Sequence, residues 1–84
     1  MSPRLSAQQQ AEYERKTREA VTVAEKNLAA AAGRGLNEVQ HDMAQKVRGF
    51  LEQAREAIAA ADWTRALTLA QKAQVLSTEL IKSL

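Results

Sequence analysis

The chain has 84 residues, a formal net charge of +2 and no cysteine. This length suits one small domain, and the missing cysteines exclude disulfide bonds, thiol catalysis and cysteine-based zinc sites. A net charge this small does not by itself indicate a nucleic-acid partner. Helix-favouring residues dominate and the only proline is Pro3, so the sequence predicts an all-α fold with residues 1–84 as a single domain.

No apolar run approaches the roughly 20 residues that a membrane-spanning helix needs. The N-terminus also lacks the apolar core of a signal peptide. The sequence therefore predicts a soluble chain without a transmembrane segment or a signal peptide. Its cellular location stays open, as does the question whether it is a full-length protein or a fragment.

A first helix is expected over residues 7–32, after residues 1–5, which are expected to fray. Ser6 and Gln9 have the spacing of a capping box. The first half of this helix is polar enough to project or to pack only partly, and Gly33 is expected to end the helix in a left-handed conformation. The apolar stripe is thin and consists of Tyr13, Thr17, Val21, Ala24, Leu28 and Ala31.

A second helix is expected over residues 38–61, with Asn37 as its N-cap and Gln40 completing a second capping box. Its apolar stripe has the clearest period in the chain. Gly49 lies inside this helix. The favoured interpretation is an exposed or closely packed position, and the alternative is a site where another backbone comes close. The stripe runs along Val39, Met43, Val47, Phe50, Ala54, Ala57 and Ala61.

A third helix is expected over residues 63–82, after a tight corner at Ala61 and Asp62. Asp62 is a good N-cap, and Trp63 is expected to fill the corner as a large wedge. Apolar residues cover more than one stripe of this helix, and Val75 lies outside them. The surplus predicts a second apolar surface, either for a partner or for the rest of a longer protein. The candidate interface residues are Leu69, Leu76, Leu80 and Leu84.

The corner between the second and third helices resembles a tetratricopeptide-type hairpin over about residues 50–76. The residues that carry this resemblance are Phe50, Ala54, Asp62, Trp63, Ala66 and Ala73. It implies two antiparallel helices around a structural corner formed by Phe50, Asp62, Trp63 and Ala66. The chain departs from the family at Ala57 and Ala70, where aromatic residues are usual, and it lacks a repeat at ~34 residues. As a whole, the chain is loosely similar to alanine-rich C-terminal helical segments of uncharacterised bacterial proteins.

No residue pattern indicates catalysis. His41 is the only histidine and is expected at the surface. Glu52 and Glu56 lie beside Arg55 as surface charges, and no residues have the spacing of metal ligands. Residues 33–35 follow a helix rather than a strand, so they form a turn and not a phosphate-binding loop. The sequence predicts no enzyme, no catalytic residue, no cofactor, no metal and no small-molecule substrate.

The expected architecture is an antiparallel three-helix bundle, with the first helix packed along the hairpin of the other two. The favoured function is non-enzymatic protein–protein interaction or self-assembly, with a protein partner or as a homodimer, through exposed apolar face on the first and third helices. The alternative is a weakly basic nucleic-acid-binding helical protein. Glutamates disfavour it because they alternate with the basic residues, in pairs such as Glu12–Lys16 and Glu14–Arg18. Membrane-surface binding is disfavoured because the first helix has no tryptophan or phenylalanine.

Overall fold

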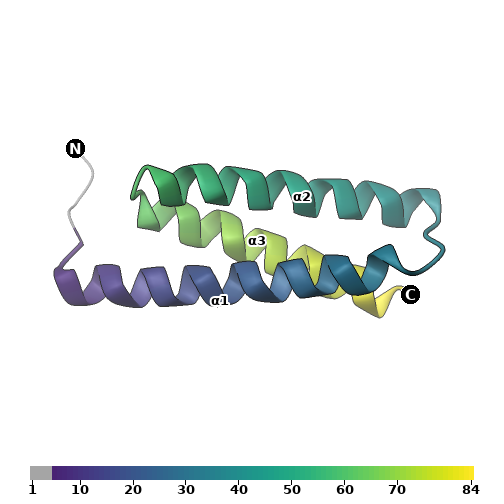
Figure 1. The fold of residues 1–84 in the computed structure, drawn as a ribbon, viewed down its shortest axis with the longest axis horizontal. Helices are drawn as coiled ribbons and strands as arrows, with labels where there is room; N and C mark the ends of the chain where they lie inside the picture. The colour runs from purple at the N-terminus through teal and green to yellow at the C-terminus, as the bar shows by residue number, and fades with distance from the viewer. Residues whose placement is uncertain (1–4) are drawn as a thin grey trace.

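The computed structural model describes residues 5–84, which form three helices and no strand (Figure 1). Helix α1 spans Ala7–Ala32, α2 spans Glu38–Ala59 and α3 spans Trp63–Lys82. Consecutive helices run in opposite directions, so the predicted all-α three-helix bundle is confirmed. Residues 1–4, which are part of the segment expected to fray, lie outside the described residues.

Each helix begins at the cap residue that the sequence predicts. Gln9 N–H donates to Ser6 Oγ (3.1 Å) and Ser6 N–H donates to Gln9 Oε1 (3.0 Å), which completes the capping box of α1. Asn37 and Gln40 form the same motif at the start of α2. The Asp62 carboxylate accepts a hydrogen bond from a backbone N–H of the first turn of α3. These side chains provide acceptors for N–H groups that have no partner within their own helix.

The left-handed residue in the described chain is Ala61, not Gly33 as predicted. Gly33 has a φ of −83°, whereas Ala61 has a φ of 55°. Asp62 N–H bonds to the carbonyl of Ala57, and Ala61 N–H bonds to that of Ile58, both at 2.9 Å. This pair of bonds is a Schellman motif, which ends a helix with one left-handed residue. Helix α2 therefore ends two residues earlier than predicted, and Ala61 is exposed in the turn rather than part of the apolar stripe.

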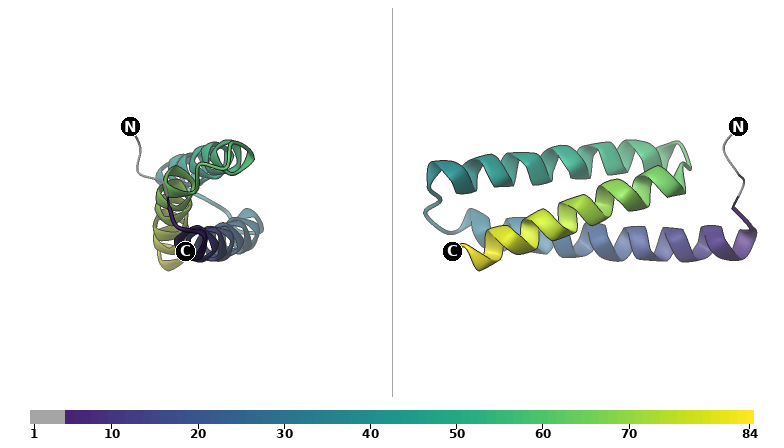
Figure 2. Two further views of the ribbon diagram at one scale, coloured as in Figure 1. Left: turned by 90° about the vertical axis from the view of Figure 1, so that its left-hand side faces the viewer. Right: turned by 180° about the vertical axis from the view of Figure 1, so that it is seen from behind.

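Helix α3 packs closely on both other helices, whereas the backbones of α1 and α2 seldom approach each other. Figure 2 shows α3 running diagonally across the pair, from the end of α2 towards the C-terminal half of α1. Close packing on two sides is possible because the core positions of α3 carry small side chains, and the distance between packed helices depends on the side chains at the contact. The fully buried small residues of α3 are Ala66, Ala70, Ala73 and Ser77.

Larger side chains fill the wider space between α1 and α2. Val47 and Leu51 of α2 form the middle of the core, and Val21 of α1 packs against them. At the surface, Arg55 Nη2 lies 2.8 Å from Glu25 Oε2 and links the two helices. Helix α1 is therefore packed chiefly along α3 and contacts α2 through long side chains.

The first turns of α1 extend past the corner between α2 and α3 (Figure 1). Residues 7–12 are all exposed, and burial within the helix begins at Tyr13 and Thr17. This confirms that the first half of α1 packs only partly. Leu5 is half-buried against the core cluster that contains Trp63, so the expectation of fraying is wrong at this residue.

The core face of α2 is rotated from the predicted stripe. Val39 is 69% exposed and Phe50 is half-buried, whereas the next residues, Gln40 and Leu51, are buried. Small residues face the core where α3 comes close, and this leaves the larger Val39, Met43 and Phe50 at the edge. The observed core stripe of α2 is Gln40, Ala44, Val47, Leu51, Ala54 and Ala57.

Candidate functional site

The residues predicted for the structural corner lie together at one end of the bundle. Trp63 is only 8% exposed and packs in a core cluster with Ala66 and with alanines of α1 and α2. Phe50 is half-buried against the same cluster, and Asp62 is exposed as the N-cap of α3. The indole of Trp63 therefore occupies the space between the helices, as expected for a wedge, and is not an exposed anchor.

Arg18 of α1 lies over the Trp63 ring. Its guanidinium carbon is 5.7 Å from the ring centre, which is within the range of a cation–π interaction. The same guanidinium lies 3.0 Å from Glu14 Oε1. Arg18 thus has two partners, Glu14 on its own helix and Trp63 at the corner.

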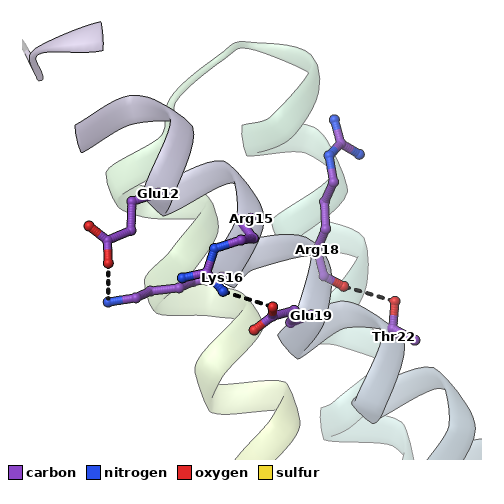
Figure 3. A network of polar contacts seen from close by, with 6 residues as sticks. All are labelled: Glu12, Arg15, Lys16, Arg18, Glu19 and Thr22. Atoms are coloured by element: carbon purple, nitrogen blue, oxygen red, sulfur yellow. Dashed lines mark hydrogen bonds and ion pairs between the residues drawn. The ribbon is translucent and has the colours of Figure 1, made fainter. Parts of the chain in front are cut away.

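Charged side chains on the first half of α1 form pairs along the helix, as Figure 3 shows. Lys16 Nζ lies 3.4 Å from Glu12, and Arg15 Nη1 lies 2.8 Å from Glu19. Three basic residues of this region, these two and Arg18, are therefore each paired with a glutamate four residues away. A nucleic-acid phosphate would have to compete with these carboxylates, so the pairing does not favour the nucleic-acid alternative.

The four leucines predicted as an interface do not share one surface. Leu69 and Leu80 are buried in the core, Leu76 is half-buried and Leu84 is exposed. The reason is that α3 packs against helices on two sides and therefore buries two neighbouring stripes instead of one. Leu80 is consequently unavailable to a partner of the folded bundle, and Leu69 keeps only 8% of its surface exposed.

A shallow apolar groove lies along the surface of α3, beside Phe50 of α2. We call it the α2–α3 groove. Val75 is 60% exposed although it lies in the middle of α3, and Lys72 Nζ lies 5.9 Å from the centre of the Phe50 ring. The groove is lined by Phe50 of α2 and, from α3, by Thr68, Gln71, Lys72, Val75, Leu76 and Glu79.

The sequence alone did not indicate this groove as a site. Phe50 was predicted for the corner, and of the four leucines predicted as an interface only Leu76 lines the groove. Two signals were present in the sequence. Val75 is apolar but falls outside the stripes of α3, and Phe50 is adjacent to the core residue Leu51. Whether these two residues line a surface groove depends on which face of α2 is turned towards the core. The packing of the three helices determines that face.

A larger and more enclosed hollow lies at the corner end of the bundle, beside the projecting part of α1. Leu5, Tyr13, Trp63 and Leu69 supply its apolar lining. Trp63 and Leu69 are core residues of the fold. Because its apolar floor largely belongs to the core, this hollow is a weaker candidate for a binding surface than the α2–α3 groove.

The predicted surface position of His41 and the grouping of potential metal ligands can be compared with the structure. His41 is exposed near the start of α2. Across residues 5–84, no three histidine, aspartate or glutamate side chains gather closely enough to hold a metal ion. Within that same range, each helix is too short or too polar to cross a membrane.

Comparison with protein-family models, with curated proteins and with solved structures finds no match to this chain. The resemblance of residues 50–76 to tetratricopeptide hairpins therefore stays a prediction, as does the likeness to alanine-rich bacterial segments.

Proposed function

We propose that the chain is a non-enzymatic interaction module that binds a helix, of another protein or of a second copy, in the α2–α3 groove. The observation that carries the proposal is the exposure of Val75, next to Leu76 and Phe50, in the shallow groove along α3. Amphipathic helices bind in such grooves by inserting apolar residues at helical spacing. The site differs from the predicted one, because α2 and α3 supply it instead of α1 and α3.

The composition of the core supports a role in association. Nine of the fourteen buried hydrophobic residues in the described chain are alanines. Alanine buries little apolar area, and burial stabilises a fold by roughly 25 cal/mol per Å². A small domain with such a core has a narrow margin of stability. Burying Val75, Leu76 and Phe50 against a partner would add a stabilisation that is considerable relative to this margin.

In-cell photo-crosslinking tests this proposal. A benzophenone amino acid replaces Val75 in the groove or, as the control, Thr22, which is exposed on α1. We expect discrete crosslinked products from position 75 and none from position 22. Adding Leu76→Glu to the position-75 protein should abolish the products, because a buried carboxylate disfavours binding. Equal crosslinking at both positions, or none at position 75, would contradict the proposal.

A further inference from the structure

We propose that the occupant of the α2–α3 groove is a second copy of this chain. In this dimer the two α3 helices lie antiparallel, and a two-fold axis passes close to Val75. The inference rests on the function proposed above and names the partner. It is carried by the positions of the charged residues beside Val75.

The charges that line the groove are self-complementary. Lys72 precedes Val75 by three residues, and Glu79 follows it by four. A two-fold axis near Val75 reverses the direction of the second helix, so Lys72 of one copy faces Glu79 of the other. The same pair forms again on the opposite side of the axis. Within residues 5–84, neither side chain belongs to an ion pair. Lys72 lies over the Phe50 ring, and its flexible side chain would turn from the ring to Glu79 of the other copy.

The spacing along the helix agrees with this arrangement. With a rise of ~1.5 Å per residue, Lys72 lies about 4.5 Å before Val75 and Glu79 about 6 Å after it. The two offsets differ by only about one residue, which flexible lysine and glutamate side chains can span. A parallel pair would instead bring Lys72 beside Lys72 and Glu79 beside Glu79, and like charges disfavour it.

The apolar residues fit the same axis. Val75 meets its counterpart at the centre, and Leu76 and Phe50 lie beside it in the groove. The remaining lining residues, Thr68 and Gln71, are uncharged. An interface that uses the same patch on both copies closes on itself, so assembly stops at two chains.

A charge-swap experiment tests the dimer by sedimentation equilibrium at low salt, up to about 1 mM protein, the range of weak association. The wild-type chain is expected to dimerise. Lys72→Glu and Glu79→Lys each place like charges across both contacts, so each alone should weaken the dimer about tenfold or more. An equimolar mixture of the two variants, and the double variant, each regain two opposite-charge pairs. Both should return to the wild-type dissociation constant.

Matched controls carry the same change of charge away from the groove. Lys26→Glu on α1 and Glu52→Lys on α2 alter exposed side chains and should leave dimerisation unchanged. Circular dichroism checks that every variant keeps its helix content. A variant with lost helix is replaced by the neutral Lys72→Gln or Glu79→Gln, which should weaken the dimer less than the charge reversal.

The outcomes separate this inference from the proposed function. A wild-type chain that stays monomeric at about 1 mM, or a double variant as weak as the single ones, overturns the dimer. If position 75 then still crosslinks, and the product mass differs from that of two chains, the proposed function stands with another partner. If position 75 gives no product and the chain is monomeric, both proposals fall.

Discussion

Gly49 lies inside α2, and a Cβ added there would meet no atom within 4 Å. Gly49 is half-buried, yet no other backbone packs against it, so the interpretation as a site of close backbone approach is wrong. Gly49→Ala should raise the free energy of unfolding by about 0.5–1 kcal/mol, because alanine loses less backbone freedom on folding. Urea denaturation monitored by circular dichroism measures the change, and a loss of stability would contradict the open surroundings of Gly49.

Ala61 is the residue for which glycine would be better suited. Its φ of 55° lies in the left-handed region, which costs a residue with a Cβ about 1–2 kcal/mol. Ala61→Gly relieves this cost but makes the unfolded chain more flexible, so a net gain of about 0.5–1 kcal/mol is expected.

The neighbouring Ala60 provides the control for Ala61. It is also exposed but has a φ of −85°, where alanine is not strained. Ala60→Gly should therefore lower the midpoint of thermal unfolding while Ala61→Gly raises it. Shifts of the same sign in the two variants would show that the left-handed conformation of Ala61 does not strain the corner.

At the scale of the helix, Gln40 ties the start of α2 to the end of α3. Its Oε1 accepts from Asn37 N–H (2.9 Å) and its Nε2 donates to the Ser83 carbonyl (2.8 Å). The side chain is buried, so its loss also leaves polar groups without partners. Gln40→Ala should cost about 1–3 kcal/mol of unfolding free energy.

Gln9 occupies the same place in the capping box of α1 but is exposed and bonds only within that motif. Gln9→Ala should cost about 0.5 kcal/mol, near the low end for a lost cap. The difference between the two variants, measured by urea denaturation, gives the contribution of the link to α3. Equal costs would mean that the Gln40–Ser83 hydrogen bond adds nothing.

The helices could be predicted from the sequence far better than the faces by which they pack. The starts of α1, α2 and α3 depend on local caps such as Ser6, Asn37 and Asp62, so neighbouring residues determine them. Whether Val39 or Gln40 faces the core depends on how closely α3 packs against α2. No local sequence pattern determines the distance between α2 and α3. The α2–α3 groove could not be predicted for the same reason.

For the molecule as a whole, Trp63 is the largest buried side chain in a core made mainly of alanine. Trp63→Ala should cost about 3–5 kcal/mol, because the surrounding alanines cannot fill the cavity. That loss should unfold much of so small a domain, which thermal melting by circular dichroism would show. Trp63→Phe keeps most of the volume and should remain folded.

The fluorescence of the wild-type protein provides an independent check. The buried indole is expected to emit at shorter wavelength in the native state than in urea. A Trp63→Ala protein that melts like the wild type would contradict the role of Trp63 as a wedge. The residue would then become a candidate for binding a partner.

The position of α3 between the other helices affects the order in which the protein folds. During synthesis α1 and α2 leave the ribosome first, yet their backbones share few close contacts, and their apolar faces are buried largely by α3. A nascent chain that has not reached Trp63 should therefore form only fluctuating helix, open to proteases and chaperones. A peptide of residues 1–60 is expected to melt without a cooperative transition, and a sigmoidal melt would contradict this. We therefore expect α1 and α2 to become protected only after α3 has been synthesised.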